Sequence, residues 1–215
     1  MTAAAFLLLS LALVAAFGNW VAVHREHQAL EYVCKPLTML LLVGVALTID
    51  TGADTGAGAV RGWFVAALVL SLLGDVLLMV PKDLFVFGLA AFLLGHIAYI
   101  VGMHVEGVDG ARFLLGIVLV MAVLAVLGTL ILRSVRAGPD RQLAGPVVAY
   151  MFVISAMVAS AIGVGGGPVI IGAGLFYVSD ALIAWNRFVA KTPHAGLSIM
   201  VTYHLAQVGL VLSLT

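Results

Sequence analysis

The sequence predicts an all-α membrane protein with eight transmembrane helices. Of the 215 residues, 64% are hydrophobic and 9% are charged, against about 45–50% and about 25% in soluble domains. Ten Lys/Arg and ten Asp/Glu are too few to cover a water-facing surface, and the mean hydropathy is +1.23. Zero net charge argues against nucleic acid as a partner. The single Cys34 excludes an internal disulfide framework and a multi-cysteine metal site.

Eight apolar runs approach or reach the length of about 20 residues that a membrane crossing needs. Clusters of Gly, Pro and charged residues separate them in order, at 24–27, 50–61, 81–83, 106–112, 133–141, 165–168 and 191–194. No Lys or Arg precedes the first run, and its apolar stretch exceeds the core of a secretion signal, so it is expected to be retained. The connections leave no room for a soluble domain, which predicts one domain over 1–215. The predicted spans are 3–23, 36–50, 62–80, 84–103, 113–133, 144–163, 168–188 and 196–214.

The orientation follows from the distribution of Lys and Arg between the two sets of loops. The loops after the first, third, fifth and seventh spans carry eight cations, and the opposite side carries only Arg61 and Arg112. We therefore expect a multi-pass protein of the cell membrane, with these odd-numbered loops cytoplasmic and both termini non-cytoplasmic. The eight cations are Arg25, Lys35, Lys82, Arg133, Arg136, Arg141, Arg187 and Lys191.

Similar residues at matching positions in the two halves of the sequence suggest a duplicated four-span unit. Pro36 opens the predicted second span and Pro146 the sixth, while Asp75 lies in the third span and Asp180 in the seventh. Four crossings return the chain to its starting side, so the two units would share one orientation. Parallel repeats of this kind occur in membrane folds, with sites near the midplane between them. The hypothesis is two parallel repeats, 1–105 and 111–215.

Two acids remain inside the spans when the loop residues are removed, Asp75 and Asp180. An Asp at the centre of a membrane helix costs about 2.5–3.5 kcal/mol on insertion scales, so an acid retained there indicates function. The structural alternative is a carboxylate that only joins helices by hydrogen bonds. The recurrence of the acids at matching repeat positions favours function.

Helical spacing places further polar residues beside these acids. Tyr177 lies three residues before Asp180, and residues three or four apart share a helix face. The fourth and eighth spans each carry a polar pair with the same spacing. These pairs are His96 with Tyr99, and Tyr203 with Gln207.

Lys35 is expected at the cytoplasmic rim of a cavity whose walls carry these polar residues. The predicted orientation places both acids and Tyr203 at middle depth or in the inner half of the membrane. An ordinary interface anchor is the alternative for Lys35.

Two carboxyl groups in a low-dielectric cavity resist being ionised together, so one keeps its proton. Such a pair supplies a general acid and a general base, and suits hydrolysis through an oxocarbenium-like state. The substrate would be membrane-resident. The same aspartates would also serve a proton-coupled transporter of a lipid or small molecule. A divalent metal on these acids, His96 and His204 is a third alternative, but no spaced metal motif supports it, and neither metal nor cofactor is expected.

Five stretches in order along the chain resemble the YhhN-type integral membrane family, the lysoplasmalogenases. The resemblance covers roughly residues 30–210. The stretches are Lys35-Pro36-Leu37-Thr38-Met39, Gly74-Asp75-Val76-Leu77-Leu78-Met79, Phe92-Leu93-Leu94-Gly95-His96-Ile97-Ala98-Tyr99, Phe176-Tyr177-Val178-Ser179-Asp180 and Thr202-Tyr203-His204-Leu205-Ala206-Gln207.

The resemblance implies hydrolysis of the sn-1 vinyl ether of lysoplasmalogens to a fatty aldehyde and glycerophosphoethanolamine or glycerophosphocholine. It implies that Asp75 and Asp180 act as acid and base and that Lys35 holds the phosphate. His96, Tyr99, Tyr177, Tyr203 and Gln207 are then expected to bind the substrate. The expected partners are a membrane lysophospholipid and the bilayer.

Overall fold

The computed structural model describes residues 1–50 and 56–215, which form helices joined by short connections. Eight helical stretches within these ranges are long and apolar enough to cross a membrane, which confirms the predicted class. The predicted connection at 50–61 includes residues 51–55, which lie outside the described ranges. The helices are α1 (Ala3–His24), α2 (Gln28–Thr48), α3 (Ala57–Met79), α4 (Phe85–Glu106), α5 (Gly110–Val123), α6 (Thr129–Ala137), α7 (Ala144–Val164), α8 (Gly167–Ala184) and α9 (Ala195–Leu212).

Three short segments complete these spans. The π-helical turn η1 (Leu124–Gly128) joins α5 to α6, so the fifth span is one continuous helix with a widened turn. A second π-helical turn, η3 (Trp185–Val189), extends α8 at its end. The 3-10 turn η2 (Arg141–Leu143) leads into α7. Single π turns are common at functional sites, and both of these lie near the pocket described below.

The second span begins eight residues earlier than predicted, because Pro36 does not start the helix. The helix starts at Gln28, after His27 accepts a hydrogen bond from the Leu30 N–H at 3.3 Å. Neighbouring helices compensate a proline inside a membrane helix, and the ion pair of Lys35 with Asp75 lies directly beside it. The other span boundaries fall within five residues of the predicted ones.

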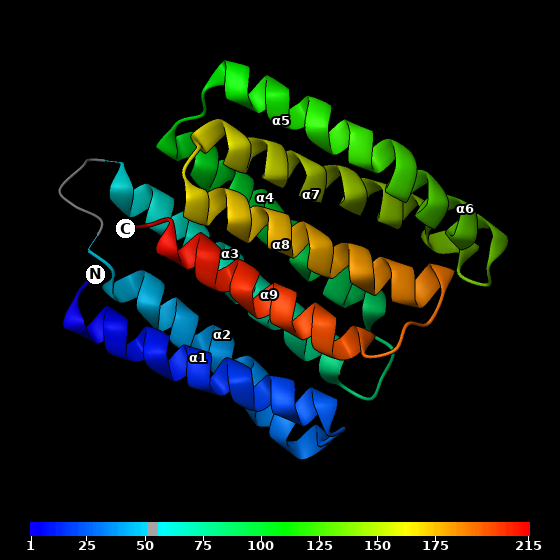
Figure 1. The fold of residues 1–215 in the computed structure, drawn as a ribbon, viewed down its shortest axis with the longest axis horizontal. Coiled ribbons are helices and arrows are strands. Elements are labelled where there is room, and N and C mark those ends of the chain that lie inside the picture. The colour runs from blue at the N-terminus through cyan, green and yellow to red at the C-terminus, as the bar shows by residue number, and fades with distance from the viewer. Residues whose placement is uncertain (51–55) are drawn as a thin grey trace.

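The bundle is built from helix pairs that lie side by side with their axes roughly aligned. Figure 1 shows α1 and α2 along one edge, α5 and α7 along the other, and α8 with α9 crossing in front of α3 and α4. The chain ends lie at one end of the bundle (Figure 1), as an even number of crossings requires.

Glycines allow the close approach of α3 and α4 next to Asp75. A Cβ atom at Gly74 would lie 2.6 Å from the Phe92 ring, and one at Gly88 would lie 2.6 Å from Leu78. Each glycine leaves room for a side chain of the facing helix, and small residues at such positions let membrane helices pack closely. The contact fixes Phe92 beside the turn that carries Asp75.

Candidate active site

Asp75 is the centre of a fully paired polar cluster in the bundle interior. Its Oδ1 lies 3.2 Å from the Nζ of Lys35 on α2, and its Oδ2 accepts a hydrogen bond of 2.7 Å from the hydroxyl of Tyr203 on α9. The Asp75 side chain is only 2% exposed. A buried charge is tolerated when it is paired and hydrogen-bonded, so this arrangement fits an ionised carboxylate beside an ammonium group.

Lys35 is part of this interior cluster rather than the rim of a cavity. Its side chain is 6% exposed, so its predicted location at the cytoplasmic rim is wrong. The second span was predicted to begin at residue 36, which placed Lys35 just outside the helix. In the structure α2 begins at Gln28, so Lys35 lies within it. Without Lys35, seven cations remain on the odd-numbered side against two on the other.

Asp180 has different surroundings. Its Oδ2 accepts a hydrogen bond of 2.5 Å from the Tyr150 hydroxyl on α7. The Nε2 of His96 on α4 lies 3.6 Å from the same oxygen, which is too long for a hydrogen bond. No Lys or Arg among the described residues forms an ion pair with Asp180. A carboxyl group buried without a cation is stable as the neutral acid.

Asp180 lies in the wall of an apolar pocket, which we call the Asp180 pocket. About 720 Å³ of empty space lies between its walls, a figure that includes the open side of the pocket. Only Asp180, Tyr150 and Tyr177 supply polar side chains, and Asp75 is absent from the wall. The lining residues are Leu78, Phe85, Leu89, Phe92, Leu127, Gly128, Ile131, Val147, Tyr150, Met151, Ile154, Tyr177, Asp180, Ala181, Ile183, Ala184 and Phe188.

Aromatic rings connect the two acidic centres. The Phe176 ring lies 4.6 Å from the His96 ring and 5.4 Å from the Tyr203 ring, edge to face in both cases. His96 also packs edge-on against Tyr150 at 5.3 Å. Edge-to-face packing of this kind orients rings, so Phe176 contacts a ring beside each of the two acidic centres.

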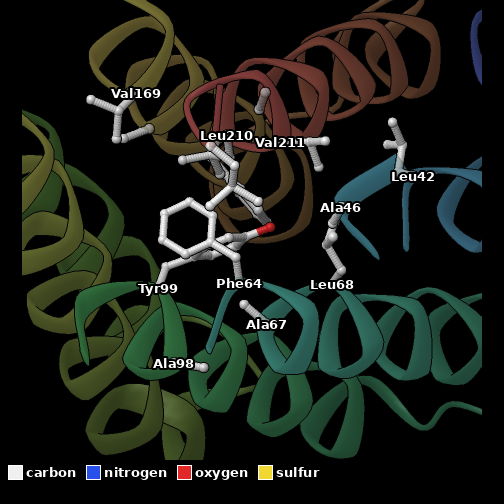
Figure 2. Close-up of a cluster of buried hydrophobic side chains, with 14 of the residues drawn as sticks. Leu42, Ala46, Phe64, Ala67, Leu68, Ala98, Tyr99, Val169, Leu210 and Val211 are labelled. Atoms are coloured by element: carbon white, nitrogen blue, oxygen red, sulfur yellow. The ribbon is translucent and has the colours of Figure 1, made fainter. Parts of the chain in front are cut away.

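Tyr99 and Gln207 lie in the core and pair with each other. The Tyr99 hydroxyl donates a hydrogen bond of 2.6 Å to Gln207 Oε1. Figure 2 shows Tyr99 packed with Phe64 beside Leu210, and the two rings meet edge to face at 5.1 Å. Neither Tyr99 nor Gln207 lines the Asp180 pocket. The two side chains therefore join α4 to α9 through a buried hydrogen bond.

Tyr150 is the functional candidate that the sequence reasoning did not identify. Tyr150 lies within the apolar sixth span. A polar hydroxyl inside a membrane helix was the feature of the sequence that could have indicated its role. Tyr150 and Asp180 are 30 residues apart, so helical periodicity cannot relate them. Only the packing of α7 against α8 brings the hydroxyl to the carboxyl group.

The metal alternative lacks a cluster of ligands. Among residues 1–50 and 56–215, no three His, Cys, Asp or Glu side chains converge as a metal site would need. His204, one of the ligands considered, instead accepts a hydrogen bond of 3.0 Å at Nδ1 from the Trp20 indole.

Known proteins resemble this chain over most of its length. It is 33% identical over 181 residues to a pig protein named "Lysoplasmalogenase TMEM86B", an alignment that covers 84% of this chain and 74% of the pig protein. The human protein of that name is 37% identical over 147 residues, 68% of this chain and 61% of the human one. A Mycobacterium bovis protein named "Lysoplasmalogenase" is 33% identical over 189 residues, 85% of this chain and 69% of that protein.

No solved structure matches the chain. The model of the YhhN family matches residues 30–214, which includes all of α3 to α9 and both acidic centres. The match confirms the family that the five sequence stretches indicated. This chain belongs to the YhhN family.

Proposed function

We propose that this protein hydrolyses the sn-1 vinyl ether of lysoplasmalogens within the membrane. The observation that carries the proposal is Asp180, a carboxyl group in the wall of an apolar pocket inside the bundle. It pairs with no Lys or Arg in the part of the chain that the structure describes. Relatives at 33–37% identity carry the name lysoplasmalogenase, and a vinyl ether is cleaved by acid catalysis. Water is the only co-reactant needed.

The two aspartates divide the roles through their neighbours. Asp75 is next to Lys35 and is the ionised group. Asp180 is the neutral acid, because its polar neighbours are the Tyr150 hydroxyl and His96. Tyr150 and His96 both face Oδ2, which leaves Oδ1 as the oxygen that presents the proton to the substrate. Asp75 as a second catalytic carboxylate stays a prediction, and its contacts fit a group that positions Tyr203.

The reaction begins with proton transfer from Asp180 to the β-carbon of the vinyl ether. The double-bond electrons form the new C–H bond, and the α-carbon becomes an oxocarbenium ion stabilised by the ether oxygen. Water adds to this carbon and gives its proton to the Asp180 carboxylate, which restores the acid. The hemiacetal then collapses: Asp180 protonates the glycerol oxygen as the C–O bond to glycerol breaks. The hemiacetal hydroxyl gives its proton back to the Asp180 carboxylate as the C=O bond forms, which releases the aldehyde and restores the acid.

The remaining predicted substrate residues take different roles in this proposal. Tyr177 contacts the substrate, since it lines the Asp180 pocket. His96 lies against the carboxyl group and orients the attacking water. Tyr99 and Gln207 hold α4 to α9, Tyr203 holds Asp75, and Lys35 neutralises Asp75 rather than binding phosphate.

The pairing of the acids supports the duplication hypothesis. Asp75, in the third span, is held by the second and eighth spans. Asp180, in the seventh span, faces the sixth and fourth spans. Each acid therefore contacts the preceding span of its own half and the last span of the other half. We propose two parallel repeats around this arrangement, with the odd-numbered loops cytoplasmic.

The test is aldehyde release by the purified protein. Lysoplasmenylethanolamine is expected to yield a fatty aldehyde and glycerophosphoethanolamine, whereas the 1-acyl lysophospholipid, which has an ester in place of the vinyl ether, is expected to yield no aldehyde. Proton-driven uptake of the lipid into vesicles without product would contradict the proposal and favour transport.

Replacing Tyr150 with Phe is expected to lower kcat about 10-fold to 100-fold and to leave KM nearly unchanged. The variant loses a hydrogen bond to the carboxylate that forms as Asp180 gives up its proton, and hydrogen bonds to charged groups contribute about 1.5–3 kcal/mol. Steady-state aldehyde release measures both constants. Tyr32→Phe, which removes an exposed hydroxyl on α2, is the control and is expected to match the wild type. A Tyr150→Phe variant with wild-type kcat would refute the role of Tyr150.

A further inference from the structure

A second pocket adjoins the Asp180 pocket at the end of the bundle that carries the odd-numbered loops. The two pockets share Leu78, Phe85 and Ile183 in their walls. The walls of the first pocket are mostly apolar, whereas the second pocket is lined by charged and amide side chains as well. We call the second pocket the charged pocket. Its lining residues are Val23, Glu31, Leu78, Phe85, Ile183, Asn186, Arg187, Lys191, Gly196, Ile199 and Met200.

The charged pocket has a positive and a negative side chain that do not pair with each other. Lys191 and Glu31 line it from opposite parts of the chain, and within the described ranges neither forms an ion pair. Asn186 uses its side-chain oxygen to accept a hydrogen bond of 3.1 Å from the Thr192 N–H, which leaves its NH₂ group as a donor. A ligand with separated negative and positive groups would satisfy both ends of this pocket.

Arg187 forms the rigid side of the charged pocket. Its guanidinium carbon lies 3.8 Å from the centre of the Phe85 ring, and its Nη2 lies 3.4 Å from Asp83 and 3.6 Å from Asp140. These contacts tie together the loops before α4 and before α7. Arg187 is thus held in place, and Lys191 is the cation whose charge remains for an anionic ligand.

The distance between the two pockets suits one amphiphilic molecule. Asp180 and Arg187 are seven residues apart on α8 and η3, which corresponds to about 10 Å along a helix. The path from the sn-1 ether oxygen through the glycerol and the phosphate to the amine of the head group spans a comparable length. The shared wall residues Leu78, Phe85 and Ile183 connect the two pockets, so one molecule can place its head group among the charged side chains and its sn-1 ether beside Asp180.

We propose that the charged pocket binds the zwitterionic phosphoethanolamine or phosphocholine head group of the substrate. Lys191, with the Asn186 amide, binds the phosphate, and Glu31 binds the ammonium group. The alkenyl chain occupies the Asp180 pocket between α6, α7 and α8. This inference rests on the proposed function, and it makes Lys191 and Glu31 determinants of head-group specificity.

The test compares three substrates that share one alkenyl chain: lysoplasmenylethanolamine, alkenylglycerol 3-phosphate and alkenylglycerol. Lys191→Gln is expected to raise KM roughly threefold to tenfold for the two phosphate-containing substrates, as loss of one exposed charge contact would, and to leave alkenylglycerol unchanged. Glu31→Gln is expected to raise KM for lysoplasmenylethanolamine alone. Lys82→Gln, an exposed lysine of the same end that lines neither pocket, is the control.

Three outcomes would overturn the head-group site. The first is an unchanged KM in Lys191→Gln, and the second is an equal change for all three substrates. The third is inhibition of the wild type by inorganic phosphate as strong as that by glycerophosphoethanolamine, which would indicate a simple anion site.

A binding measurement separates failure of this inference from failure of the proposed function. The 1-alkyl analogue of lysophosphatidylethanolamine has no vinyl ether and is not cleaved. Its affinity for the wild-type protein is expected to fall threefold to tenfold in Lys191→Gln whether or not aldehyde is released. Equal affinities in the two proteins would refute the site, and absent aldehyde release with the expected loss of affinity would refute only the proposed function.

Discussion

Asp180→Asn is expected to reduce aldehyde release from lysoplasmenylethanolamine about 10²-fold to 10⁴-fold, the range typical of losing a general acid. The amide keeps an oxygen that accepts the Tyr150 hydrogen bond, so the geometry around position 180 is retained. It has no carboxyl proton to give to the vinyl ether carbon. The effect is expected in kcat, with thermal stability close to that of the wild type.

The measurement is a single-turnover assay of aldehyde formation with excess protein, which isolates the chemical step from product release. Glu26→Gln is the matched control, because it removes an exposed carboxylate from the loop after α1. It is expected to retain wild-type rates. If Asp180→Asn retained more than about a tenth of the wild-type rate, Asp180 would not be the acid.

Asp75→Asn is expected to destabilise the protein by about 3–5 kcal/mol, because it leaves the Lys35 ammonium uncompensated in the bundle interior. The Tyr203 hydroxyl keeps an acceptor in the amide oxygen, so the lost ion pair dominates the change. Aldehyde release is expected to fall as well, since a destabilised centre displaces the helices that carry Tyr203 and Phe176, and Phe176 packs against His96 beside Asp180.

A double variant distinguishes the effect of the unpaired Lys35 charge on stability from the effect of losing Asp75 on activity. Lys35→Met combined with Asp75→Asn removes both charges, so no uncompensated charge remains in the bundle interior, and the amide oxygen still accepts the Tyr203 hydrogen bond. Thermal unfolding in detergent is expected to return close to the wild-type midpoint, while aldehyde release stays low. Recovery of both stability and activity would show that Asp75 serves the fold alone. A single Asp75→Asn variant with wild-type stability would contradict the ion pair itself.

The spans and the two acids could be predicted from the sequence because each depends on local composition. A run of about 20 apolar residues is itself the requirement for crossing a bilayer, and one Asp within such a run is visible without any knowledge of its neighbours. The start of α2 was predicted wrongly at Pro36, since proline ordinarily marks a boundary. Here neighbouring helices support it inside the helix.

The neighbours of each acid could not be predicted in the same way. Periodicity places Tyr177 on the face of Asp180, but it says nothing about which helix covers that face. Tyr203 is 128 residues from Asp75, and Tyr150 is 30 residues from Asp180. Such contacts arise when side chains of separate helices pack, and many pairings of eight apolar helices satisfy the same composition.

The sequence by itself therefore determined that this protein spans the membrane eight times, that Asp75 and Asp180 lie inside it, and which family it resembles. Only the tertiary structure decided that Lys35 neutralises Asp75 and that Asp180 faces the apolar pocket with no Lys or Arg from residues 1–50 or 56–215 paired to it. The physical reason is that the ionisation of a buried carboxyl group depends on the charges within a few ångströms. Those charges come from helices that are distant along the chain.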